Sequence, residues 1–139
     1  MALVISKALR EGASGVCFEV VNNGAEESGT TVIDVASLSG AGDLDNHEIL
    51  ITRVVASVVS SAAGTPALTT LSWGDGTDFL HLGAGTTDLN ITFQTPNASG
   101  SNNADVTVTC AENVLFTLRI FAKKMVGYPT SMGHSKHRP

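Results

Sequence analysis

The sequence predicts an all-β protein: a single-domain antiparallel β-sandwich of about eight strands. Three observations favour this fold class. Apolar and polar residues alternate along several segments, which is the pattern of a strand with one buried face. Turn residues, among them 14 glycines and 4 prolines, separate these segments at the spacing typical of sandwiches and barrels. No window of the 139 residues shows a convincing 3.6-residue helical period.

The first half of the chain contains three predicted strands. Val16–Val21 and Thr30–Leu38 are rich in β-branched residues, and each is followed by a run of turn residues. Glu48–Ser60 is longer, and it is apolar on both faces around its middle. This pattern predicts a central strand bent by a bulge.

A hairpin is predicted next. The segments Leu68–Trp73 and Asp78–Leu82 flank the run Gly-Asp-Gly-Thr at positions 74–77. Glycine and aspartate in so short a connection are typical of a tight turn between antiparallel strands.

Three further strands follow. In Asp88–Thr95, Leu89, Ile91 and Phe93 are predicted to share one face. Asp105–Cys110 alternates in the same way. The last strand, Val114–Lys124, alternates over its whole length, and its predicted buried face comprises Val114, Phe116, Leu118, Ile120 and Ala122.

The two ends differ from the body. Residues 1–14 lack alternation, and residues 127–139 consist largely of Gly, Ser, His, Lys and Pro. We therefore expect a β-sandwich domain over residues 15–126, with a loose N-terminal arm over 1–14 and a flexible basic C-terminal tail over 127–139.

Composition limits the possible classes. Hydrophobic residues make up 42% of the chain, which is enough apolar surface for one core. No apolar run is long enough to span a membrane, and the N-terminus lacks the pattern of a secretory signal, so we expect synthesis in a cytoplasm. Cys17 and Cys110 each lie in a predicted strand, and we expect both to be buried free thiols.

Charge is sorted along the sequence. All 13 acidic residues lie between Glu11 and Glu112, where the only basic residue is Arg53, and the net charge is −5. The remaining basic residues lie near the two ends. Basic ends on an acidic body favour association with sister subunits or with another acidic surface, so the pattern indicates a component of an assembly.

No catalytic group is predicted. Ser72, Asp75 and His81 flank the predicted hairpin, but His81 alternates with two leucines and is expected on the solvated face. No glycine-rich phosphate loop or nucleophile elbow is present. We expect the protein not to be an enzyme and to use no cofactor and no small-molecule substrate.

Candidate metal ligands are sparse. Asp43, Asp45 and Glu48 supply oxygen ligands of the kind that calcium prefers, without the EF-hand pattern, and a plain acidic loop is the favoured interpretation. Asp75 with Asp78, and His134 with His137, are weaker candidates. The acidic body and the aromatic content of 5% leave no stacking platform for a specific nucleic acid.

A family resemblance emerges from these features. A small, acidic β domain rich in Gly, Ser, Thr and Asn, with alternating strands through Val106–Lys124, glycine turns such as 83–85 and the tail 127–139, resembles the cement or decoration proteins of tailed bacteriophage heads. The resemblance implies a jelly-roll or other β-sandwich fold. It also implies a dimer or trimer that binds the major capsid protein on the capsid exterior of the virion and stabilises the shell.

Contacts with the partner are expected at both ends and on apolar side chains. The candidate partner-binding residues are Lys7, Arg10, Lys123, Lys124, Lys136 and Arg138. Phe121, Trp73 and Phe79 are candidates for apolar contact. Two alternatives stay open: a carbohydrate-binding β-sandwich module, and a tail, fibre or head-completion subunit of a virion.

Overall fold

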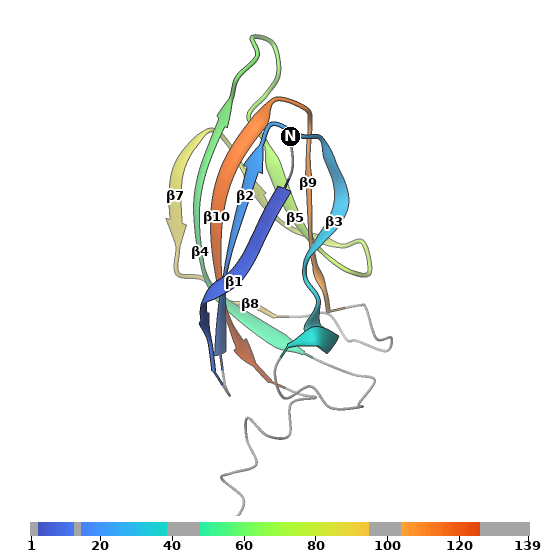
Figure 1. Cartoon of the computed structure of the whole chain (residues 1–139), viewed down its shortest axis with the longest axis vertical. Coiled ribbons are helices and arrows are strands. Elements are labelled where there is room, and N and C mark those ends of the chain that lie inside the picture. Colours follow the sequence, from blue (N-terminus) through green and yellow to red (C-terminus); the bar gives the residue numbers. More distant parts are fainter. Residues whose placement is uncertain (1–2, 13–14, 39–47, 95–103, 126–139) are drawn as a thin grey trace, which may run out of the picture.

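A computed structural model of the chain describes residues 3–12, 15–38, 48–94 and 104–125, and these residues form ten strands in two antiparallel sheets (Figure 1). The six-stranded sheet contains, in spatial order, β1 (Leu3–Glu11), β2 (Gly15–Asn23), β10 (Val114–Lys124), β4 (Ile49–Ser60) and β7 (Gly85–Leu89), with β8 (Phe93–Gln94) also paired to β4. The four-stranded sheet contains β3 (Glu27–Ile33), β9 (Val106–Cys110), β5 (Thr69–Trp73) and β6 (Asp78–Leu82). The predicted all-β sandwich is confirmed.

The strand order is that of a jelly roll. The chain passes from β2 in one sheet to β3 in the other, returns to β4, and crosses again to β5. The last crossing, from β9 to β10, places the final strand between β2 and β4 (Figure 1). Eight strands arranged as 2-10-4-7 facing 3-9-5-6 make the double-sheet jelly roll, to which β1 and β8 are additions.

The core lies between the two sheets and follows the predicted alternation. On β10, every second residue from Val114 to Ala122 is buried and the residues between them are exposed or half-buried. Neighbouring strands alternate in the same phase, because antiparallel pairing places side chains of one face opposite each other. The largest fully buried side chains include Val20, Ile33, Ile51, Val54, Leu71, Val106, Leu118 and Ile120.

The predicted bulge lies in β4. Phe121 of β10 pairs with Arg53, whereas the next residue, Ala122, pairs with Ile51, so Thr52 is the extra residue. The Thr52 hydroxyl donates a hydrogen bond to the Phe121 carbonyl over 3.3 Å. A bulge bends a strand and changes which side chains share a face. The prediction of a central, bulged strand is confirmed.

The predicted β5–β6 hairpin is also confirmed. The Trp73 amide donates to the Thr77 carbonyl over 2.8 Å, and the Gly76 amide donates to the Trp73 carbonyl over 2.9 Å. The Asp75 carboxylate accepts from the Thr77 amide over 2.9 Å. Gly76 has a φ of 96°, a conformation that favours glycine, so the turn chemistry explains the sequence at this point.

Asp88–Thr95 differs from its prediction as one strand. Strand β7 ends at Leu89 and β8 comprises only Phe93 and Gln94, and the two pair with β4 on either side of its bulge. The prediction that Leu89, Ile91 and Phe93 share a buried face is wrong for Ile91, which is 54% exposed. Pairing with β4 is interrupted at the bulge, so Ile91 lies between the two short strands and belongs to neither of them.

The predicted strand Thr30–Leu38 ends earlier than expected. Strand β3 stops at Ile33 and is followed by a single 3₁₀ turn, Val35–Ser37. The Asp34 side chain caps this turn by accepting from the Ala36 amide. The Val35 amide donates over 2.9 Å to the side chain of Asp105, which directly precedes β9, the neighbour of β3 in the same sheet. Side-chain acceptors therefore take the place of strand pairing at this point.

The N-terminal segment requires a correction. Leu3–Glu11 forms β1 and pairs with β2 at the edge of the six-stranded sheet, whereas an arm without a strand was predicted. The register shifts between Ser6 and Arg10, and this irregularity hides the alternation in the sequence. Backbone hydrogen bonds at a sheet edge form without an alternating pattern. The predicted tail, 127–139, lies outside the described residues.

Candidate functional site

The residues considered for nucleophilic catalysis do not assemble. The Thr70 hydroxyl and His81 Nδ1 form a cross-strand hydrogen bond of 3.0 Å, and the Ser72 hydroxyl donates to Asp78 over 2.6 Å. Both pairs lie on the outer face of the four-stranded sheet, as register requires. His81 is exposed, as predicted. Each group therefore stabilises the β5–β6 ladder through a different partner, and no Ser–His–Asp relay is formed.

No metal centre is visible in the part of the chain that the structure describes, where no group of three His, Cys, Asp or Glu residues could hold an ion. Asp75 and Asp78 accept hydrogen bonds from Thr77 and Ser72. Asp43, Asp45, His134 and His137 lie outside the described residues. Among residues 3–12, 15–38, 48–94 and 104–125, no helix is long and apolar enough to cross a lipid bilayer.

Both cysteines are buried free thiols, as predicted. Cys17 lies on β2 and Cys110 on β9, so they belong to different sheets. Burial raises the pKa of the Cys110 thiol above its usual value, which keeps the sulfur protonated at neutral pH. The Asn22 amide donates to the Cys110 sulfur over 3.4 Å. These features are typical of structural thiols.

A buried polar cluster surrounds Asn22. Its Nδ2 group donates to the Ala25 carbonyl over 2.9 Å and to the Val114 carbonyl over 2.8 Å, which ties β2 to the start of β10. Asn22 Oδ1 and the nearby Thr69 hydroxyl are buried without a partner. Sequence reasoning missed this cluster, although Asn22 continues the buried positions Phe18 and Val20 at a spacing of two.

The candidate partner-binding residues fall into different environments. Lys123 is exposed on β10. Lys124, its neighbour, is only 2% exposed and its Nζ donates to the Gly12 carbonyl over 2.8 Å. The prediction of Lys124 as a docking residue is therefore corrected, because its ammonium group holds the β1–β2 connection. Lys7 and Arg10 lie on β1, and Lys136 and Arg138 lie outside the described residues.

Lys124 is expected to contribute to stability. Replacing Lys124 with alanine removes a charge-assisted hydrogen bond and the buried methylene chain, so we expect the free energy of unfolding to fall by about 2 kcal/mol. Lys123→Ala is the matched control, because its side chain is exposed, and we expect a change within about 0.5 kcal/mol. Urea denaturation followed by circular dichroism measures both. Equal losses for the two variants would contradict this assignment.

Two ion pairs lie on the outer face of the six-stranded sheet. Arg53 forms a bidentate pair with Asp88, with Nε–Oδ1 and Nη2–Oδ2 distances of 2.9 and 2.7 Å. The Arg53 guanidinium also lies 5.4 Å from the ring centre of Phe121. Arg119 and Glu19 form a longer contact of 3.4 Å. Arg53, the one basic residue in the acidic body of the sequence, thus connects β4 to β7.

The Arg53–Asp88 pair predicts a pH effect. Hydrogen bonds from Arg53 hold the pKa of the Asp88 carboxyl below its usual value. The ion pair therefore stabilises the folded state at pH values above the pKa that the Asp88 carboxyl has in the unfolded chain. This stabilisation is lost as the pH falls through the lower pKa that the carboxyl has in the folded protein. In NMR titrations we expect Arg53→Gln to raise the pKa of Asp88 toward its ordinary value. Arg119→Gln, on the neighbouring pair, is the control and is expected to leave it unchanged.

The apolar candidates are distributed differently from the prediction. Trp73 is 4% exposed and stacks on Phe79 with ring centres 4.4 Å apart, and Phe79 meets Phe93 at 5.2 Å. These three rings connect the two sheets inside the sandwich. The expectation of an exposed apolar contact is therefore wrong for Trp73, whereas Phe79 is half-buried against the core. Phe121 is half-buried on the outer face and remains a candidate.

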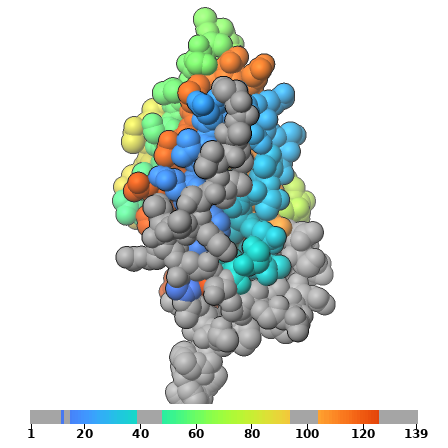
Figure 2. Space-filling view, viewed as in Figure 1, coloured from blue at the N-terminus to red at the C-terminus, as the bar shows by residue number. Residues whose placement is uncertain are grey.

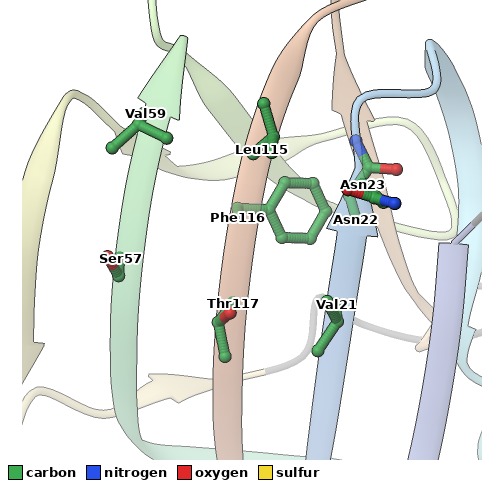
Figure 3. A pocket seen from close by; sticks show the side chains of 8 residues that line it. All are labelled: Val21, Asn22, Asn23, Ser57, Val59, Leu115, Phe116 and Thr117. Atoms are coloured by element: carbon green, nitrogen blue, oxygen red, sulfur yellow. The ribbon is translucent and has the colours of Figure 1, made fainter. Parts of the chain in front are cut away.

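A shallow hollow of about 200 Å³ lies at one end of the six-stranded sheet (Figure 3). Val59 of β4 and Leu115 of β10 lie beside each other in it, and Ser57, Thr117 and Val21 form a row farther along the same strands. The β4–β5 loop (green) and the β9–β10 turn (orange) meet next to this end (Figure 2), where the Ser61 amide donates to the Asn113 carbonyl. A second hollow, of about 210 Å³, includes Leu68 and Thr109.

Charge is partitioned between the sheets. Every basic residue in the described ranges belongs to β1, β4 or β10 of the six-stranded sheet. In the same ranges, the residues of the four-stranded sheet and its hairpin that carry a formal charge are all acidic, and they include Glu27, Asp75 and Asp78. Basic residues, which lie mostly near the ends of the sequence, are therefore collected in one sheet of the sandwich, and the described part of the other sheet has only acidic charges.

The fold and its surfaces define a jelly-roll β-sandwich whose conspicuous features are two differently charged sheet faces. Comparison with known proteins adds no relative: no family model, no curated protein and no solved structure matches the chain. The function is therefore argued from the molecule itself.

Proposed function

We propose that this protein is a non-enzymatic structural protein of a virus particle, which binds the outer surface of a phage capsid and stabilises the shell. Its partners are the major capsid protein and further copies of itself, as a dimer or trimer. The alternative within virions is a tail, fibre or head-completion subunit. The protein is made in the host cytoplasm and acts on the capsid exterior.

One observation carries this proposal. The described chain is a jelly roll in which Ser72, Asp75 and His81, the side chains considered for catalysis, each bond to a different residue of the β5–β6 hairpin. Jelly rolls are common in viral capsid and lectin domains, so the fold supports the proposal by analogy. Two extensively paired sheets form a rigid domain that can make the same contacts at every equivalent position of a symmetric shell. Many weak contacts of this kind together give a high overall avidity.

The observed burial of the aromatic residues disfavours the second candidate, a carbohydrate-binding module. Trp73, the single tryptophan, is buried between the sheets and presents no ring to a sugar. Glycan platforms depend on exposed aromatic faces, since a ring stacks on the apolar side of a pyranose.

The test is a binding experiment with capsid shells assembled without this protein. We expect saturable co-sedimentation at a fixed ratio to the capsid protein, and shells that withstand a higher temperature when the protein is bound. Retention on a glycan array without any binding to the shells would contradict the proposal and favour the carbohydrate-binding module.

A further inference from the structure

We infer that the shell-binding surface is the outer face of the six-stranded sheet, and that it docks on an acidic surface of the capsid protein. This inference rests on the proposed function and specifies its contact. The outer six-strand face is defined by the outward residues of β2, β10 and β4, chiefly Val21, Leu115, Val59, Val55, Phe121 and Lys123.

Apolar side chains are exposed on the outer six-strand face. Val59 is 53% exposed, and Val21, Leu115, Val55 and Phe121 are half-buried on the same face. The outward residues of a solvated antiparallel sheet are ordinarily polar, because only the inner face contributes to the core. Adjacent aliphatic side chains on the outer face, with the hollow between Val59 and Leu115 (Figure 3), are typical of a contact surface.

Charge also distinguishes this face. The ion pairs Arg53–Asp88 and Arg119–Glu19 neutralise both acidic groups that β2 and β7 place on this face. Lys123 is exposed beside them without an acidic residue opposite it on β2 or β4, and β1 adds Lys7, Arg10 and Glu11 to the same sheet. The described charges of this face therefore sum to a positive value on a protein whose net charge is −5, and the face favours an acidic partner.

Apart from Leu68, which directly precedes β5 at the second hollow, the opposite face has the character of a solvated surface. On the four-stranded sheet, Thr107 bonds to the Ser72 carbonyl, and Ser72 and Thr70 bond to Asp78 and His81 on the next strand. These polar groups are satisfied within the sheet, and the charges there are acidic. An acidic partner would therefore bind the six-stranded face in preference to this one.

The occupant is a protein surface. A nucleic acid would find a single half-buried ring, Phe121, for stacking on this face, which is too little for a stacking platform. A second copy docking through the same face would bring like charges together around Lys123, which opposes that contact.

The test compares two matched double variants in binding to shells assembled without the protein. Val59→Ser with Lys123→Glu changes the six-stranded face. Leu68→Ser with Thr31→Glu makes the same apolar-to-polar change and adds a glutamate on the four-stranded side, where Leu68 is 46% exposed and Thr31 is exposed, although its charge change is one unit smaller. We expect the first variant to bind at least about tenfold more weakly, and the second within about twofold of the unmodified protein. Melting temperatures confirm that both fold. If the first double variant does not fold, Lys123→Glu alone carries the comparison.

Each outcome is decisive. The inference is supported if the unmodified protein binds the shells more weakly as the salt concentration rises from about 50 to about 300 mM, and if the affinity of the first variant depends less steeply on salt. Shell binding that both variants retain equally, or that only the second variant loses, overturns the inference and leaves the proposed function standing. A dimer that only the first variant disrupts, without loss of shell binding, assigns the face to a second copy and overturns it. Absence of any shell binding by the unmodified protein defeats the proposed function itself.

Discussion

Replacing Asn22 with aspartate is expected to lower the free energy of unfolding by about 4 kcal/mol at neutral pH. The substitution keeps the shape of the side chain but puts a carboxylate oxygen where Nδ2 donates to the Ala25 and Val114 carbonyls. Asn22 is 2% exposed, so the new charge would be buried without a partner. Chemical denaturation monitored by tryptophan fluorescence measures the loss, since Trp73 is buried in the fold.

The same variant is expected to regain stability in acid. Burial raises the folded-state pKa of an unpaired carboxyl above its unfolded value, so the penalty develops as the pH rises from the unfolded pKa toward the folded pKa. Protonation below that window removes the buried charge. Asn23→Asp is the control, because Asn23 is exposed at the adjacent position, and it is expected to change stability little. A pH-independent loss in the Asn22 variant would contradict the assigned cause.

Leu118→Ala is expected to cost about 3 kcal/mol of unfolding free energy. Leu118 is fully buried at the middle of β10, between Val20 of β2 and Ala56 of β4. Truncation removes apolar contacts and leaves a cavity that paired strands on both sides cannot easily close.

Thr117→Ala is the control for that substitution. Thr117 is the preceding residue on the same strand and is exposed on the opposite face, so we expect a change within about 0.5 kcal/mol. Urea denaturation of both variants tests the alternation directly. Similar losses at the two positions would contradict the assignment of the inner and outer faces.

The sequence predicted those parts of the fold in which one face of a strand is buried. β10 has the predicted bounds because alternation continues through all 11 of its residues. The hairpin at Gly76 followed from turn chemistry. β1 was missed because an edge strand pairs through its backbone and its register is irregular. The division between β7 and β8 depends on the bulge at Thr52 of another strand, which local sequence does not encode.

The surface was predicted less completely than the fold. The sequence sorts basic residues to its ends, but only the strand order reveals that both ends enter the same sheet. Lys124 was assigned to a partner by its charge, although it occupies the same phase of alternation as Leu118 and Ala122. Extending the every-second-residue pattern of buried side chains from Ala122 by two residues would have predicted that Lys124 is buried. Trp73 was considered exposed although it alternates with Leu71, which lies on the buried face of the same strand. The contact of Trp73 with Phe79, and that of Phe79 with Phe93, require strands of both sheets.

The position of β10 has a consequence for the order in which the protein is built. Among the strands that the structure describes, β10 comes last in the sequence, yet it lies between β2 and β4 in the interior of its sheet. Val20 and Leu118, neighbours across that sheet, come from opposite ends of the chain, so the contacts have high sequence separation. Such topologies fold slowly, because loop closure precedes the gain from pairing. The six-stranded sheet therefore cannot be completed before residues 114–124 have left the ribosome. A chain truncated before Val114 would lack the strand that joins the facing edges of β2 and β4.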